Sequence, residues 1–211
     1  MSNYKTVFFI LGVLQIILGL SMIVPIIAQF YYNQVDSGFI GSGLVSIIFG
    51  VLFFLSNLDY EKKLTLPQAF LLTALSWLSI AIFGSLPFVF SDLSLSFTNA
   101  FFESMSGITT TGSTILTNLN ETPKAILLWR AMLQWLGGIG IIVMAITLMP
   151  IMNIGGMQLF VISNTHTPEK ILPKSKEISI RLIVIYSSLT LVCAFSVSYT
   201  HLRAHETIAD R

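Results

Sequence analysis

The chain has 211 residues, of which 54% are apolar and 10% are charged, with a net charge of +1. A soluble domain carries about 25% charged residues to cover its surface, so this composition excludes a soluble domain and predicts an integral membrane protein. The near-zero net charge excludes an extended basic surface for nucleic acid. The single cysteine, Cys193, excludes an internal disulfide and a thiolate metal cluster.

Five long stretches of the chain contain no charged residue, and each can hold the roughly 20 residues that cross a bilayer as a helix. We expect membrane-spanning helices at residues 7–28, 38–58, 68–90, 125–149 and 178–199. The fold class is therefore predicted to be all-α integral membrane.

Lysine and arginine residues set the expected orientation, because they gather in cytoplasmic loops. The loop at residues 57–66 contains Lys62 and Lys63, and the segment at residues 152–177 contains three lysines, so both are predicted to be cytoplasmic. The connections at residues 33–37 and after Phe90 contain aspartate and no basic residue, and are predicted to lie outside. The N-terminus is then cytoplasmic.

This orientation requires residues 94–123 to leave and return on the same face, because one inward crossing, at residues 125–149, already follows them. The apolar piece at residues 97–102 is too short to span. We expect a re-entrant loop with a short helix at residues 99–107, about 15 Å long. Its C-terminal end would present unpaired carbonyls toward the membrane centre, which favours a cation.

The segment SMSGITTTGSTILT, at residues 104–117, contains eight Ser or Thr among its fourteen residues. Irregular backbone at membrane depth survives only where protein buries it or where it lines a wet cavity. Successive carbonyls aimed at an axis can replace the hydration shell of an ion, and Gly112 would permit the backbone angle that this needs. The residues alone leave two interpretations open, an ion filter and an external Ser/Thr-rich loop.

The runs FFESMSGITTTGSTIL (residues 101–116) and LLWRAMLQWLGGIGIIVMAITLMP (residues 127–150) closely resemble the Trk-type potassium-uptake family, more narrowly its TrkH-like membrane subunit within the Trk/Ktr/HKT superfamily. The stretch THTPEKILPKSKEI (residues 165–178) resembles the family's cytoplasmic linker into a second repeat. The resemblance covers residues 1 to about 197. It implies four helix–pore loop–helix repeats on one chain, each giving a quarter of a potassium filter in the plasma (inner) membrane.

The resemblance also assigns the filter residues. Thr110 and Thr111 would supply carbonyls that coordinate potassium, and Gly112 matches the filter glycine. Ser113 and Thr114 would continue the filter outward.

Three further residues are expected to support the filter: Glu103, Gly107 and Arg130. Glu103 lies inside the predicted short helix, where an unpaired carboxylate is expensive, and Arg130 is its candidate partner. Glu103 either holds the back of the filter or adds negative potential at its outer mouth, and we favour the first role. The glycines of the WLGGIGI run let another backbone approach closely.

Potassium is expected as the transported substrate, with no cofactor and no enzymatic reaction. The resemblance also implies three partners. They are the lipid bilayer, a second copy in a homodimer of the full-length form, and a cytoplasmic nucleotide-binding regulatory subunit (TrkA-like). No nucleic acid is expected.

The chain departs from the resembled family in length, because family members are more than twice as long. We expect two leading helices, one complete repeat, a cytoplasmic linker, the first helix of a truncated second repeat and a non-native tail, at residues 1–60, 64–150, 151–177, 178–197 and 198–211 respectively. This chain alone is then expected to be inactive. Two alternatives stay open: a short subunit of a homotetrameric cation channel, and a non-conducting membrane interaction protein.

Overall fold

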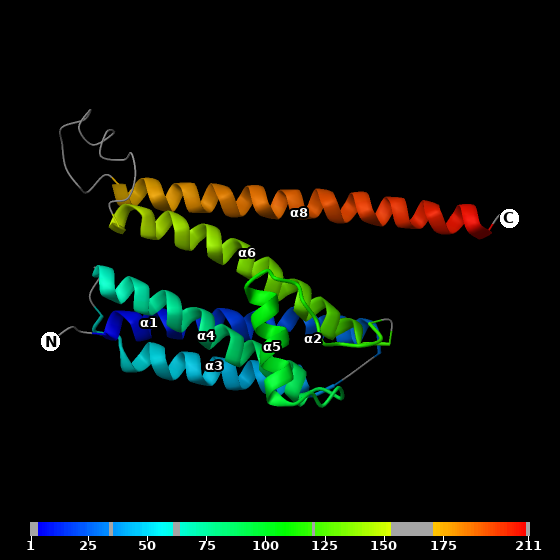
Figure 1. Ribbon diagram of the computed structural model, residues 1–211, viewed down its shortest axis with the longest axis horizontal. Helices are drawn as coiled ribbons and strands as arrows, with labels where there is room; N and C mark the ends of the chain where they lie inside the picture. Colours follow the sequence, from blue (N-terminus) through cyan, green and yellow to red (C-terminus); the bar gives the residue numbers. More distant parts are fainter. Residues whose placement is uncertain (1–3, 34–35, 61–63, 120, 153–170, 210–211) are drawn as a thin grey trace. The chain divides into compact units, whose positions relative to one another are not determined.

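The computed structural model describes residues 4–33, 36–60, 64–119, 121–152 and 171–209, and all regular structure in these ranges is helical. The chain divides into two compact units, Met1–Ile141 and Ile142–Arg211. The helices are α1 (Lys5–Ser21), α2 (Ile23–Tyr31), α3 (Gly38–Ser56), α4 (Leu66–Phe90), α5 (Phe97–Ile108), α6 (Lys124–Met152) and α8 (Ile171–Ala209) (Figure 1).

Within the described residues, five helical stretches are long and apolar enough to cross a membrane. They are Lys5–Tyr31, Gly38–Ser56, Leu66–Phe90, Lys124–Ala145 and Glu177–Thr200. Each coincides with one of the predicted spans, so the predicted all-α membrane fold is confirmed. The predicted linker at residues 151–177 lies mostly outside the described residues, as do Lys62 and Lys63.

The first predicted span consists of two consecutive helices, because the helical hydrogen bonding is interrupted at Met22, between α1 and α2. Pro25 explains the break. It has no N–H to donate to the carbonyl of Ser21, and its ring crowds that carbonyl. The N–H of Met22 instead bonds to the carbonyl of Gly19, one residue short of the α-helical partner, at 3.3 Å.

Helices α1 and α3 approach closely through paired glycines. A Cβ added to Gly12 would lie 2.7 Å from the carbonyl oxygen of Gly50, and one added to Gly19 would lie 2.9 Å from that of Gly43. Only hydrogen at these positions lets the two backbones pack at this separation, as is common between membrane helices.

The connections of the Met1–Ile141 unit sort to two ends. At one end the ring of Phe9 stacks on Tyr60, with centroids 3.9 Å apart, so the start of α1 lies beside the loop after α3. At the other end the N–H of Asp92 donates to Asp36 Oδ2 at 3.3 Å. The connections predicted to share a face therefore do share an end of this unit.

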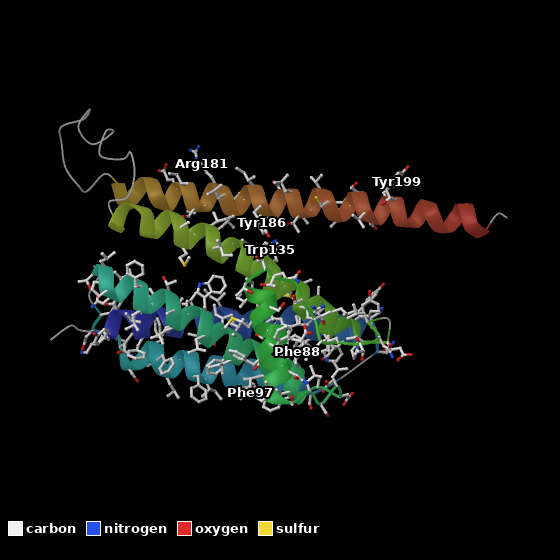
Figure 2. The ribbon with its side chains drawn as sticks, in the orientation of Figure 1. Phe88, Phe97, Trp135, Arg181, Tyr186 and Tyr199 are labelled. Carbon is white, nitrogen blue, oxygen red and sulfur yellow. The ribbon has the colours of Figure 1, made fainter. Side chains whose placement is uncertain are left out.

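The core of the Met1–Ile141 unit forms where α4, α5 and α6 meet the first three helices. Phe88 of α4 is fully buried, whereas Phe97 at the start of α5 is 55% exposed (Figure 2). The buried cluster consists of Leu18, Met22, Phe39, Phe88, Ala100, Ala125, Ile126, Trp129 and Leu133. This packing fixes α5 against its neighbours and so positions the segment that follows it.

Candidate ion-binding loop

Helix α5 is longer than the predicted helix at residues 99–107, since it runs from Phe97 to Ile108. Ser96 starts it as an N-cap: its hydroxyl accepts the N–H of Asn99 at 3.4 Å, which satisfies one of the free donors of the first turn. In Figure 1, α5 lies across the long helices α3 and α4 rather than along them.

The C-terminal end of α5 contacts the middle of α6, far from the first residue of that helix. A Cβ added to Gly137 would sit 1.9 Å from the carbonyl oxygen of Ile108, so the two backbones are in direct contact there. Gly137 is thirteen residues after Lys124, the first residue of α6, which is about 20 Å along a helix axis. The segment at residues 109–123 must therefore return over this distance to begin α6.

The end of α5 has the hydrogen bonds of a Schellman motif. The N–H of Thr111 bonds to the carbonyl of Ser106 at 3.0 Å, and the N–H of Thr110 bonds to that of Gly107 at 2.9 Å. Between them Thr110 has φ of 59°, the left-handed conformation that glycine usually supplies. A β-branched residue rarely adopts this conformation, so the backbone of Thr110 is strained.

These bonds correct one prediction. Unpaired carbonyls were predicted at the end of the short helix, but the carbonyls of Met105, Ser106 and Gly107 each accept an N–H from the residues that follow. The carbonyl of Met105 also accepts the hydroxyl of Thr109 at 2.8 Å. The prediction is wrong for these three groups, because the chain turns back on the helix end and satisfies them.

The carbonyls of Thr110 and Thr111 point away from α5. In a trans peptide the C=O and the next N–H point in opposite directions. The N–H groups of Thr111 and Gly112 both point at the carbonyl of Ser106, at 3.0 and 3.2 Å. The carbonyls that precede them therefore face the opposite side, where residues 110–115 are exposed within this unit.

Gly112 takes a positive φ of 78°, a backbone angle that its lack of a Cβ permits. Space is not its constraint: a Cβ would lie 3.5 Å from Nε2 of Gln134, an ordinary contact. The glycine is therefore needed for its backbone angle.

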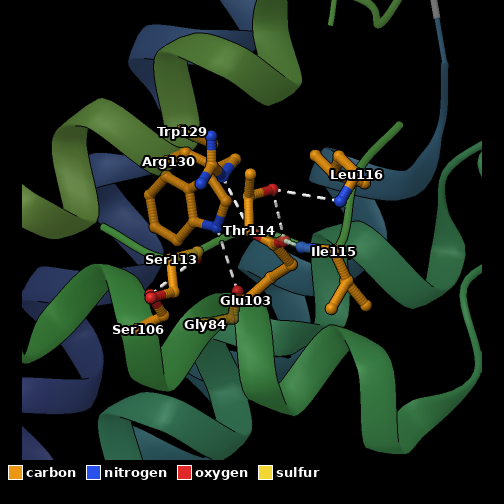
Figure 3. Close-up of polar contacts among 9 residues, drawn as sticks. All are labelled: Gly84, Glu103, Ser106, Ser113, Thr114, Ile115, Leu116, Trp129 and Arg130. Carbon is orange, nitrogen blue, oxygen red and sulfur yellow. Dashed lines mark hydrogen bonds and ion pairs between the residues drawn. The ribbon is translucent and has the colours of Figure 1, made fainter. Parts of the chain in front are cut away.

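Glu103 connects α5, the loop and α6 (Figure 3). Its Oε1 accepts both the hydroxyl of Thr114 and the N–H of Ile115, each at 2.6 Å, and its Oε2 accepts Nε of Arg130 at 2.7 Å. The predicted pairing of Glu103 with Arg130 is thus present. The carboxylate side chain has no exposed surface, so its charge is balanced by the guanidinium inside the protein.

The remaining predicted residues lie in the same neighbourhood. Gly107 faces α6, where a Cβ would meet Cβ of Leu133 at 3.0 Å. The carbonyl of Ser113 accepts the hydroxyl of Ser106 at 2.6 Å. The loop N–H of Ile115 points at Glu103, so the carbonyl of Thr114 faces away from it.

Sequence reasoning missed Ser106, Gly84 and Trp129 as parts of this site. Trp129 is fully buried, and its Nε1 donates to the carbonyl of Gly84 at 2.9 Å (Figure 3). The signal for Ser106 was its position three residues after Glu103, which places both on one face of a helix. Gly84 carried no local signal, because its partner lies 45 residues later in the chain.

The comparisons with known proteins agree on one family of cation transport proteins. The TrkH cation transport protein family matches residues 5–208. The chain is 36% identical over 210 residues to the Trk system potassium uptake protein TrkH of Escherichia coli strain K12, a match that covers 98% of this chain and 44% of that protein. It is 34% identical over 182 residues to an uncharacterized cation transporter of Methanocaldococcus jannaschii, covering 86% and 37% respectively.

A solved structure agrees with these matches. The crystal structure of the potassium transporter TrkH from Vibrio parahaemolyticus aligns with a TM-score of 0.78 and 34% identity, over 90% of this chain and 38% of that one. The chain therefore spans less than half the length of these relatives. It is a multi-pass membrane protein that belongs to the TrkH family of cation transport proteins.

Proposed function

We propose that this chain supplies one pore-loop unit of a potassium-uptake transporter. Residues 94–123 enter the membrane from the outer face and return to it, and the carbonyls of Thr110 and Thr111 replace part of the hydration shell of potassium. Potassium then crosses the plasma membrane inward along its electrochemical gradient, with no covalent step.

The direction of the Thr110 and Thr111 carbonyls carries this proposal. The N–H groups of the same two peptides, which belong to Thr111 and Gly112, are hydrogen-bonded to the carbonyl of Ser106. The two oxygens are therefore held in place before an ion arrives. Preorganised oxygens compensate for ion dehydration without a further ordering cost. The exposed side of this loop is where further loops of the same kind would complete the filter.

The charge distribution around the loop fits carbonyl coordination rather than a carboxylate site. Glu103 is paired with Arg130 and directed at the back of the loop, so it adds no unbalanced charge to the ion path. Among the described residues no group of three or more His, Cys, Asp or Glu side chains could hold a metal ion. The ligands that we assign to the ion are the carbonyl oxygens of Thr110 and Thr111.

Several features of the whole transporter belong to this proposal as well. The N-terminus is cytoplasmic, the assembled form is a homodimer, and a cytoplasmic nucleotide-binding subunit regulates it. The names of the relatives support potassium as the substrate, since they are potassium uptake proteins.

The test is growth at low potassium of a bacterium that lacks its own potassium uptake systems. One strain expresses a version extended through the natural downstream gene, and a second expresses residues 1–211 alone. We expect rescue only from the first. Rescue by residues 1–211 alone would favour the homotetrameric channel, and absence of rescue from both would contradict the proposal.

Gly112→Ala separates transport from a non-conducting role. Because φ at this position is 78°, alanine should distort the loop and abolish rescue. The matched control is Gly41→Ala in α3, where an added Cβ meets nothing within 4 Å. If both variants rescue growth as well as the unsubstituted protein, the filter role of this loop is wrong; if the unsubstituted protein does not rescue growth at all, a membrane interaction protein becomes the better interpretation.

A further inference from the structure

We infer that Ser106 is a positioning residue that removes one carbonyl from the ion path. This inference rests on the proposed function. It concerns how many backbone oxygens this unit presents to a cation, and therefore how well it distinguishes potassium from sodium.

Ser106 contacts three consecutive loop residues. Its carbonyl accepts the N–H groups of Thr111 and Gly112, and its hydroxyl donates to the carbonyl of Ser113 at 2.6 Å. Ser106 is 7% exposed as a residue, so water does not compete freely for these bonds. A single residue of α5 thus fixes the backbone on both sides of Gly112.

The two kinds of contact orient the peptides in opposite directions. Where Ser106 accepts an N–H, the preceding carbonyl faces away from α5, as at Thr110 and Thr111. Where Ser106 donates to a carbonyl, that carbonyl faces α5, as at Ser113. The reversal occurs between the N–H of Gly112 and the carbonyl of Ser113, a stretch in which Gly112 has a positive φ.

The carbonyl of Ser113 is therefore turned toward α5, where it accepts the hydroxyl of Ser106, and away from the exposed side on which an ion would bind. The carbonyl of Ser113 thus differs in direction from those of Thr110 and Thr111. The carbonyl of Thr114, which follows it, faces away from Glu103. Losing the Ser106 hydroxyl would free the peptide after Ser113 to rotate and add an oxygen to the path. The number of coordinating carbonyls contributes to ion selectivity. The bond between Ser106 and Ser113 should therefore affect how well this unit distinguishes potassium from sodium.

The test compares Ser106→Ala with Ser104→Ala in the version extended through the natural downstream gene. Ser104 is another buried serine of the same helix, and within the described residues its hydroxyl has no hydrogen-bond partner. Potassium and sodium uptake are measured in the same membrane vesicles, so their ratio does not depend on the amount of protein. Ser106→Cys gives a second variant of nearly the same size with a weaker donor.

We expect Ser106→Ala to change the potassium-to-sodium ratio by about 3- to 10-fold, the range for loss of one hydrogen bond. Ser106→Cys should fall between alanine and serine, and Ser104→Ala should leave the ratio unchanged. If both Ser106 variants match Ser104→Ala while potassium uptake persists, the inference is wrong and the proposed function stands. If the unsubstituted protein takes up no potassium, the proposed function itself fails, and the inference with it.

Discussion

Thr110 holds the most strained backbone of the candidate filter. A left-handed conformation costs a residue with a Cβ about 1–2 kcal/mol, and Thr110 adopts it with φ of 59° at the position where a helix most often has glycine. Strain of this kind persists where the surrounding structure imposes it and is frequent at functional sites. The loop is held in this form by N–H groups that bond to α5 on both sides of Thr110.

We predict that Thr110→Gly stabilises the folded protein by up to about 1 kcal/mol, the relief of strain less the entropy that glycine adds to the unfolded chain. Potassium affinity should fall at the same time, because the loop becomes less restricted. Thermal stability in detergent and uptake kinetics measure the two effects. The matched control is Thr117→Gly, at an exposed position without positive φ, which should be slightly destabilising. Equal effects of the two variants would contradict the argument.

Glu103→Gln should reduce the amount and thermal stability of the protein without changing its ion selectivity. The amide can still accept from the loop, but it leaves the Arg130 guanidinium without its counter-charge, at a cost of about 1–3 kcal/mol. Glu121→Gln is the control, because Glu121 is an exposed carboxylate of the same connection. A change in the potassium-to-sodium ratio with normal stability would favour the other role, a negative potential at the mouth.

At the scale of elements, glycines decide how closely α5 and α6 pack. Gly107 and Gly137 lie on the contact between these helices, and the carbonyl of Ile108 occupies the space that a Cβ at position 137 would need. Gly84 extends the same contact to α4, where it accepts the Trp129 indole and lies against Ser104. The position of the loop along α6 therefore depends on glycines, which have no side chain to separate the helices.

Gly137→Ala is predicted to displace the end of α5 and to destabilise the protein by about 1–3 kcal/mol, the usual cost of overpacking. Gly140→Ala is the control: it lies in the same run of α6, and nothing described lies within 4 Å of an added Cβ. Because alanine is the better helix former, that variant should be neutral or slightly stabilising. Detergent stability and potassium uptake should both separate the two variants, and equal behaviour would argue against the contact.

At the scale of the molecule, the two ends of the Met1–Ile141 unit should lie on opposite faces of the membrane. Leu119 follows the candidate filter and Leu58 lies near the start of the connection after α3, and both are exposed, at 42% and 55%. On a Cys193→Ser background, Leu119→Cys should react with an impermeant maleimide in intact cells. Leu58→Cys should react only after the cells are opened. The reverse pattern would invert the predicted orientation, and labelling of both in intact cells would contradict a spanning unit.

The sequence by itself determined the spans and the position of the candidate filter. Composition excluded a soluble domain, and charge-free stretches located five helices within a few residues, because the bilayer imposes one length on every crossing. The Ser/Thr-rich run with Gly112 marked the candidate loop, and the resemblance to the Trk-type family assigned its filter residues. The cost of a buried carboxylate predicted the pairing of Glu103 with Arg130.

Only the tertiary structure decided how the loop is held. The break at Met22 is a local effect of Pro25, but the contacts of Gly84, Gly107 and Gly137 join residues distant in the chain and leave no periodic pattern. The direction of each carbonyl depends on which neighbour takes the adjacent N–H, and the sequence does not specify that neighbour. Ser113 accordingly matched a filter motif by sequence, while in the fold its oxygen accepts the hydroxyl of Ser106.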